Sequence, residues 1–192
     1  VQINRSAHFN EVFLDEVRIP VANVVGEIDG GWGPARTVLS NESAFIGGAK
    51  AATAPKLVDL ARAHGVADDP VIRQRLADFH TRERLAGWMG EQIQQAVRRG
   101  EMPPMDPGLT KLMASANRRC AGDLAMAISG AAGVAGDDPT TSWTQSELMG
   151  RYGISIGGGT DQVLKNNIGE RSLGLPREPG YDKTMPWRDI PK

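Results

Sequence analysis

Cysteine is almost absent from the sequence, and the positive and negative charges nearly cancel. Cys120 is the single cysteine, so no disulfide bond can form within the chain, and its apolar helical neighbours indicate a buried structural residue. This usage of cysteine is compatible with a reducing compartment, and we expect a cytoplasmic location. The net charge of −1 gives no electrostatic reason to expect binding to nucleic acid or to an anionic membrane surface.

Long apolar runs and metal-binding patterns are also absent. Hydrophobic residues form 40% of the chain, but no unbroken run of them reaches the length of about 20 residues that a membrane-spanning helix needs. The three histidines, His8, His64 and His80, are scattered and show no metal-ligand spacing. We therefore expect neither a membrane span nor a bound metal.

Apolar residues recur at helical spacing through most of the chain. This spacing predicts three long helices, over about residues 32–45, 71–99 and 108–129, and shorter ones over about 57–65, 142–150 and 160–171. Glycine and proline between residues 47 and 55 predict a break or kink there, and Asp68-Asp69-Pro70 is a typical helix start. Long helices with short links favour a mainly α fold, an antiparallel helix bundle.

The two ends of the chain differ from this helical pattern. Residues 8–14 and 17–19 are rich in Phe, Val, Leu and Ile, which predicts a short β segment before the bundle. The tail beyond Pro176 contains three further prolines and lacks periodicity. We expect this tail to be extended and to pack on another subunit through Tyr181 and Trp187.

The most informative segment is the glycine-rich turn Gly157-Gly158-Gly159, which leads through Thr160 into the last predicted helix. The first backbone N–H groups of a helix have no partner within it, so they can bind an anion or a carbonyl oxygen. The same pattern also occurs in tight connections that bind nothing. Thr160 equally suits a helix N-cap, and Asp161 suits the positive end of the helix dipole without any ligand.

Both ends of the chain resemble the acyl-CoA dehydrogenase family. The last helix leads into Glu170-Arg171-Ser172-Leu173-Gly174-Leu175-Pro176-Arg177-Glu178-Pro179, which is similar to the C-terminal signature of that family. The segment from Phe9 to Pro20, with Gly30-Gly31-Trp32 after it, resembles the passage from the family's β-domain into its C-terminal helical domain. The resemblance therefore covers nearly the whole chain.

The resemblance implies a division of the chain into three parts. Residues 1–30 correspond to the end of a β-domain and a linker, residues 31–172 to the helical bundle domain, and residues 173–192 to the tail. Full-length members carry an N-terminal helical domain and most of a β-domain before this point. We therefore expect the chain to be the C-terminal half of a larger protein.

The resemblance also implies an FAD-dependent oxidoreductase of lipid metabolism that desaturates an acyl-CoA thioester between its α and β carbons. A glutamate removes the α-proton, and preorganised donors must stabilise the enolate-like oxygen. In many members this glutamate directly precedes the Gly-Thr step, where the sequence has Gly158, whose lack of a side chain excludes it as a base. Other members carry the base on the first long helix of the domain, where the sequence has Glu42.

We therefore predict Glu42 as the catalytic base. Burial among the apolar neighbours Ala44, Phe45 and Ile46 would raise its pKa toward the range useful for a base. The alternative is an ordinary solvated glutamate on a helix face. Members that use this position often have Arg after the Glu, whereas Ser43 follows here, so a charge near the base is missing.

The glycine turn retains a predicted role in spite of the missing glutamate. In the family, a backbone N–H at the position of Gly158 helps to bind the thioester oxygen, and glycine keeps that donor. The absence of side chains here, including at Gly159, leaves space near the reacting carbons. We expect the pocket to accept a bulky or branched acyl group, such as a steroid side chain or ring fragment.

Three residues are predicted to contact FAD. Thr160 and Gln162 match a Thr-x-Gln pattern that contacts FAD in the family. Gly130 opens a Gly-Ala-Ala-Gly segment that resembles the Gly-Gly-x-Gly turn that meets FAD from a neighbouring subunit, although Ala131 replaces a glycine and Ala127 replaces an expected Gln. The family resemblance implies a homo- or hetero-tetramer and an electron acceptor such as an electron-transfer flavoprotein.

Two further functions stay open at this point. The loss of the glutamate at the Gly158 position and the altered FAD turn also fit a catalytically silent subunit that only structures a hetero-oligomer. A related flavin oxidase, or a different chemistry at the α-carbon, is a third possibility.

Overall fold

The computed structural model describes residues 1–192 except residues 5, 48–52, 107, 137, 178–184 and 191–192. The described part contains helices and short 3-10 turns and no strand. In chain order the elements are η1 (Val21–Asn23), α1 (Trp32–Gly47), α2 (Ala54–Ala63), α3 (Pro70–Arg98), α4 (Gly108–Ser129), η2 (Gly130–Gly133), α5 (Pro139–Gly150), α6 (Gly153–Ile156), α7 (Asp161–Arg171) and η3 (Trp187–Asp189). The predicted mainly α helix bundle is confirmed.

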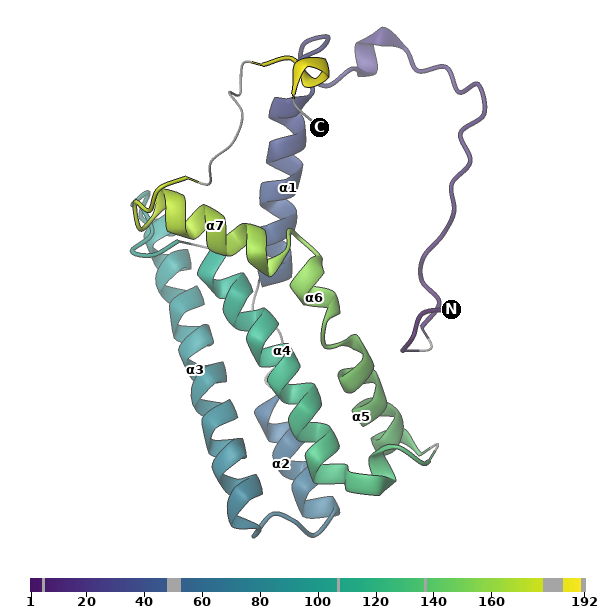
Figure 1. Cartoon of the computed structure of the whole chain (residues 1–192), viewed down its shortest axis with the longest axis vertical. Helices are drawn as coiled ribbons and strands as arrows, with labels where there is room; N and C mark the ends of the chain where they lie inside the picture. Colours follow the sequence, from purple (N-terminus) through teal and green to yellow (C-terminus); the bar gives the residue numbers. More distant parts are fainter. Residues whose placement is uncertain (5, 48–52, 107, 137, 178–184, 191–192) are drawn as a thin grey trace.

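α4 is the central helix of this bundle and packs against α1, α2, α3, α5, α6 and α7. α2, α3, α4 and α5 run along the long axis of the molecule, and α7 lies across one end of α3 and α4 (Figure 1). The apolar core lies between α2, α3 and α4 and consists of Ala54, Leu57, Leu60, Ala61, Ile72, Phe79, Ala121, Leu124, Ala125 and Ile128. None of the described helices combines the length and the apolar character needed to cross a membrane.

Side-chain caps determine where several helices begin. Asp69 accepts hydrogen bonds from the backbone N–H groups of Val71 and Ile72, both at 2.9 Å, and Pro70 takes the first position of α3, as the sequence predicted. Asp138 and Pro139 start α5 in the same way. α5 therefore begins three residues before the predicted start at Ser142, because this cap was not recognised in the sequence.

A long-range cap starts α2. Glu83, in the middle of α3, accepts hydrogen bonds from the backbone N–H groups of Thr53 and Ala54. These N–H groups have no partner within α2 itself. The predicted break between residues 47 and 55 agrees with the end of α1 at Gly47 and the start of α2 at Ala54, and residues 48–52 lie outside the described residues.

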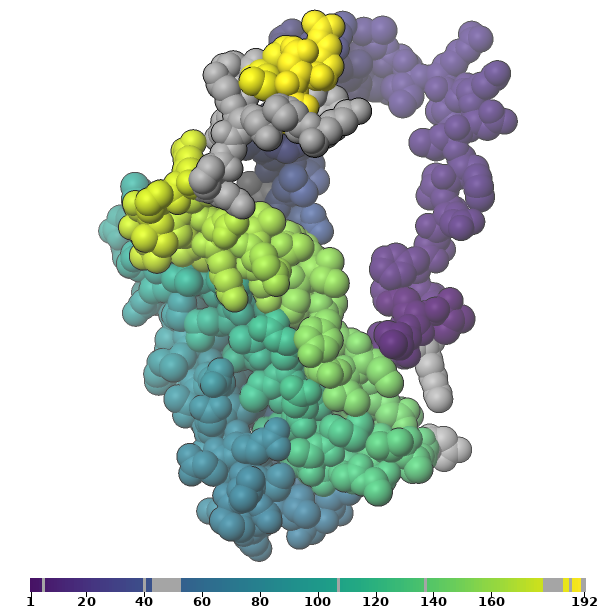
Figure 2. Space-filling model, in the orientation of Figure 1, coloured from purple at the N-terminus to yellow at the C-terminus, as the bar shows by residue number. Residues whose placement is uncertain are grey.

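The predicted strands over 8–14 and 17–19 are wrong for this chain. In the described part of the N-terminal segment the backbone is extended without strand pairing, and apolar side chains such as Phe9 and Phe13 are exposed. A strand forms only when a neighbouring strand pairs with its backbone groups, and the described chain offers none. The segment stands apart from the bundle, with open space between them (Figure 2).

The tail is only partly described. Tyr181 lies outside the described residues, and Trp187 begins the short turn η3, which the sequence did not predict. The predicted packing of this tail on another subunit therefore stays a prediction. α6, a single short helical turn before the glycine-rich segment, was also not predicted.

α4 and α5 approach each other closely at Gly122. A Cβ atom added at this glycine would lie 2.9 Å from the backbone oxygen of Glu147 and 3.2 Å from the Cα atom of Leu148. Two ion pairs flank the contact, Arg118–Glu147 at 3.0 Å and Asp123–Arg151 at 3.1 Å. The absence of a side chain at position 122 therefore allows the two helices to pack at this separation.

We expect Gly122→Ala to lower the free energy of unfolding by about 1–3 kcal/mol, because the new methyl group must push backbone atoms of α5 away. Urea unfolding of the full-length protein measures this change. Gly87→Ala is the matched control: Gly87 lies on an exposed face of α3 with no atom within 4 Å of an added Cβ, and this substitution should stabilise by about 0.5–1 kcal/mol. Equal stabilities of the two variants would contradict the close contact.

Candidate active site

One stripe of α4 carries three polar residues toward α6 and α7. Lys111, Ser115 and Arg119 are spaced four residues apart, so they lie on the same face of the helix. Lys111 and Ser115 are fully buried, while about a third of the Arg119 side chain is exposed. Polar groups buried to this extent require partners, and Asp161, the first residue of α7, provides them.

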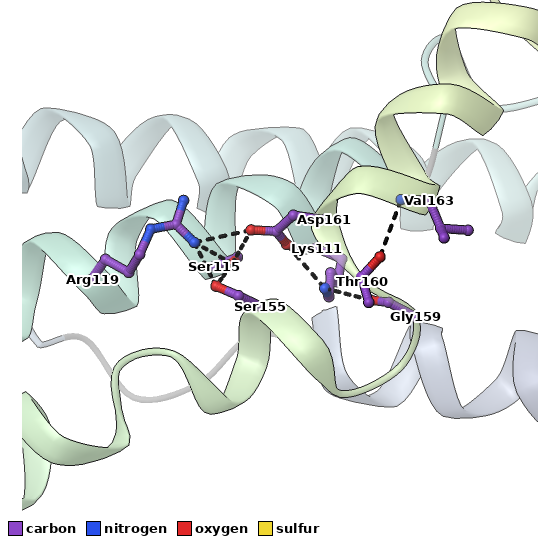
Figure 3. Close-up of polar contacts among 8 residues, drawn as sticks. All are labelled: Lys111, Ser115, Arg119, Ser155, Gly159, Thr160, Asp161 and Val163. Atoms are coloured by element: carbon purple, nitrogen blue, oxygen red, sulfur yellow. Dashed lines mark hydrogen bonds and ion pairs between the residues drawn. The ribbon is translucent and has the colours of Figure 1, made fainter.

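Asp161 accepts hydrogen bonds with both of its carboxylate oxygens (Figure 3). Lys111 Nζ lies 3.0 Å from Asp161 Oδ1, whereas Ser115 Oγ and Arg119 Nη1 lie 2.7 Å and 2.9 Å from Oδ2. The Ser155 hydroxyl, on α6, lies 2.7 Å from that of Ser115 and also accepts from Arg119. The network thus joins α4, α6 and α7.

The network holds the carboxylate of Asp161 in its ionised form. Burial alone would raise the pKa of Asp161, but the hydrogen bonds from Ser115, Arg119 and Lys111 outweigh this effect and lower the pKa to about 2. Two cations thus face one carboxylate, and the N-terminus of α7 adds the positive end of its helix dipole. The start of α7 is therefore an electropositive region.

The glycine-rich turn before α7 is bound directly to this network. Lys111 Nζ donates to the backbone oxygen of Gly159 at 2.7 Å, in addition to Asp161. Gly158 and Gly159 have φ angles of +65° and +88°, in the left-handed region that favours glycine. Thr160 is the N-cap of α7 and accepts from the backbone N–H of Val163 at 3.2 Å, which confirms the expected N-cap role.

Glu42 lies on α1, whose C-terminal half passes beside the turn between α6 and α7 in both Figure 1 and Figure 3. The structure therefore brings the helix of the predicted base next to the turn of the predicted backbone donor. Glu42 itself is exposed, so the expected burial is not found in this chain. The side chains of Phe45 and Ile46, which were predicted to bury it, are outside the described part.

The predicted FAD contacts fall into two separate groups. Thr160 and Gln162 lie at the start of α7, near the N-terminal end of α4. Asp161, next to Thr160, contacts Ser115 in the first half of α4, and Gly130 follows the other end of this helix, about 22 Å further along at a helical rise of 1.5 Å per residue. One copy of the chain does not bring the two groups together, and the role of Gly130 toward a neighbouring subunit stays a prediction.

The residues at both places suit a flavin. The Thr160 hydroxyl accepts from Val163, and among the described contacts its own hydrogen has no acceptor, while the Gln162 carboxamide is exposed. Such donors match the carbonyl oxygens and ring nitrogens of a flavin. Gly130 is exposed, with a φ of +54° and no atom within 4 Å of an added Cβ, so its backbone is accessible to a ligand.

The sequence-based prediction missed Lys111, Ser115 and Arg119, and it assigned Asp161 only to the helix dipole. A signal for them exists in the sequence. The three polar residues recur every four positions in a helix that is otherwise largely apolar, so they form one polar stripe. Such a stripe on a central helix indicates a buried polar network.

We expect Asp161→Asn to lower the free energy of unfolding by about 3 kcal/mol at neutral pH, since it leaves Lys111 and Arg119 without a carboxylate. Because the pKa of Asp161 in the folded protein is below the ordinary value, its contribution is present above about pH 4 and is lost as the pH falls toward 2. The stability difference between wild type and variant should therefore shrink over that range in urea unfolding.

Asp59→Asn is the control for this prediction. Asp59 pairs with Arg62 on the exposed surface of α2, and the loss of such a pair changes stability by less than about 1 kcal/mol. A pH-independent effect of Asp161→Asn, or an effect as small as that of the control, would contradict the ion network.

Comparison with known proteins places this geometry in a family. Residues 29–173 match the family model described as "Acyl-CoA dehydrogenase, C-terminal domain". The chain is 33% identical to acyl-CoA dehydrogenase IpdE1 of Mycolicibacterium smegmatis, over 92% of this chain and 45% of that protein. It is 35% identical to acyl-CoA dehydrogenase IpdE1 of Mycobacterium tuberculosis, over 93% of this chain and 47% of that protein.

A solved structure of an acyl-CoA dehydrogenase (ACAD) is also similar to this chain. The chain resembles the steroid ACAD Tcur3481-Tcur3483 with a TM-score of 0.73 and 28% sequence identity, over 86% of this chain and 45% of that chain. The chain thus spans less than half the length of the curated relatives it matches. Acyl-CoA dehydrogenases are oxidoreductases, and the family generally uses FAD. The chain belongs to the acyl-CoA dehydrogenase family and comprises its C-terminal helical domain.

Proposed function

We propose that this chain is the C-terminal part of an FAD-dependent acyl-CoA dehydrogenase that introduces a double bond between the α and β carbons of an acyl-CoA thioester. The observation that carries this proposal is the anchored glycine turn at the start of α7, beside the helix that carries Glu42. Desaturation needs a base at the α-carbon and a donor at the thioester oxygen. The helix that carries Glu42 would provide the base, and the glycine turn would provide the donor.

Glu42 is the proposed base. Its carboxylate takes the α-proton, and the electron pair of the broken C–H bond forms the double bond as hydride leaves the β-carbon. Exposure of Glu42 in this chain leaves the carboxylate accessible to a substrate. Contact with bound acyl-CoA would bury the carboxylate beside the α-carbon.

The glycine turn is the proposed site for the thioester carbonyl. Negative charge develops on the thioester oxygen as the α-proton leaves, and a backbone N–H at Gly158 would stabilise it. The two cations of the network and the N-terminus of α7 add positive potential in the same region. Lys111 thus supports the turn without itself reaching the substrate.

Thr160 and Gln162 would hold FAD from one subunit, and Gly130 would meet the FAD of a neighbouring subunit. FAD, when bound, supplies the acceptor for the hydride that leaves the β-carbon. Residues on both sides of the cofactor would require at least two subunits, and the family resemblance implies a homo- or hetero-tetramer that passes electrons to an acceptor such as an electron-transfer flavoprotein.

The turn also suggests the class of acyl group. No atom lies within 4 Å of a Cβ added at Gly159, so space is present where other residues would place side chains. This space favours a bulky or branched acyl group over a linear short chain. The solved relative is described as a steroid ACAD, which supports a steroid-derived thioester as substrate.

Glu42→Gln tests the proposed base. We expect this substitution to lower turnover of acyl-CoA in the full-length protein by about 10²–10⁴-fold, since the amide cannot accept the α-proton. Turnover is followed by reduction of a dye that accepts electrons from the flavin. Glu91→Gln, an exposed glutamate on α3, is the matched control and should leave turnover unchanged. Wild-type turnover in the Glu42 variant would exclude this residue as the base.

A second candidate is a catalytically silent subunit of a hetero-oligomeric acyl-CoA dehydrogenase. Gly158 favours it, because many members have the catalytic glutamate at this position, and its φ of +65° disfavours any side chain there. In this case the chain would support FAD and an active site that a related, active subunit provides.

Flavin absorbance separates the two candidates. For an active subunit, we expect the purified full-length protein to show a flavin spectrum that bleaches when an acyl-CoA thioester is added. A silent subunit would bind little flavin alone and would show bleaching only after an active relative is added. Bleaching without a partner would rule out the silent subunit, whereas its absence under all conditions would refute both.

A further inference from the structure

Lys111 makes two contacts that have different consequences. Its ammonium group neutralises Asp161, a task that it shares with Arg119, and it also binds the backbone oxygen of Gly159. Through the second contact it binds the backbone of the Gly157–Gly159 turn. Lys111 is 1% exposed, so water does not replace its contact with Gly159.

The turn needs such an anchor because of its composition. Gly158 and Gly159 both adopt positive φ angles, and glycine populates positive and negative φ about equally readily. Two consecutive glycines therefore have several backbone conformations of similar energy. A buried, charge-assisted hydrogen bond to Gly159 favours the conformation in which its carbonyl points toward α4.

We propose that Lys111 is a positioning residue that fixes the backbone conformation of the Gly157–Gly159 turn for the reaction. This inference rests on the proposed function, in which the turn binds the thioester oxygen. A fixed carbonyl at Gly159 also fixes the orientation of the preceding peptide groups. Lys111 thereby acts on the reacting oxygen through the backbone, from a buried position on the far side of the turn.

Two single substitutions test the proposal in the folded protein, because each removes one of the two cations near Asp161 and leaves the other in place. Lys111→Met removes one of two cations and leaves Asp161 with Arg119 and Ser115. Arg119→Met removes the other cation and leaves Lys111 on both Asp161 and Gly159. The two variants change the charge around Asp161 equally, and only the first removes the contact to the turn.

Hydrogen exchange in the full-length protein, with its partner subunit where it has one, compares the variants. We expect the amides of residues 157–161 to exchange about tenfold faster in Lys111→Met, and at nearly the wild-type rate in Arg119→Met. Equal exchange in the two variants would overturn the proposal, because the turn would then respond only to the charge at Asp161. Should Lys111→Met not fold, Lys111→Gln takes its place with the same two outcomes.

Kinetics with an acyl-CoA thioester provide the second measurement. A misplaced turn stabilises the transition state less while substrate binding is retained, so kcat should fall about tenfold in Lys111→Met with KM within about twofold. Lys165→Met, an exposed lysine on α7, is the control and should leave both constants unchanged. Faster exchange with an unchanged kcat would also overturn the proposal.

The two proposals fail in different ways. If the wild-type protein reduces no flavin with any thioester, alone or with a partner, the proposed function fails. The exchange rates of residues 157–161 in the two network variants then still decide whether Lys111 holds the turn.

Discussion

The buried contact of Lys111 with Asp161 and Gly159 is the interaction on which the candidate site depends. Burial of an ammonium group is costly unless charged and polar partners surround it, and here the partners come from the end of the glycine turn and the first residue of α7. The network therefore ties the start of α7 to the middle of the bundle. Lys111 binds both the carbonyl of Gly159 and the carboxylate of Asp161, and so holds the end of the turn against α4.

Much of the bundle could be predicted from the sequence because its signals are local. Asp69 and Pro70 mark the start of α3, and the apolar spacing of α4 gives its bounds as the structure has them. The features that the sequence did not predict correctly depend on an interaction partner that lies far along the chain or is absent from the described residues. Glu83 caps a helix about 30 residues away, and residues 8–19 lack a second strand to pair with.

In the candidate site, too, some features follow from the local sequence and others depend on the tertiary fold. Gly158, Thr160 and their neighbours form a motif that is recognisable in sequence, and the N-cap follows from local chemistry. The buried network was not predicted, because Asp161 meets α4 only through the tertiary fold. The exposure of Glu42 was also not predicted, since apolar neighbours along one helix do not show what covers that helix. Which residues surround this carboxylate depends on contacts beyond the helix itself.

The positive φ of Gly158 also bears on how this chain could change through evolution. A glutamate introduced at this position, where many members carry their base, would have to adopt the left-handed conformation at a cost of roughly 1–2 kcal/mol. The anchored turn opposes the backbone rotation that would relieve this strain. Under the proposed function, a single substitution would therefore not readily return the base from α1 to position 158.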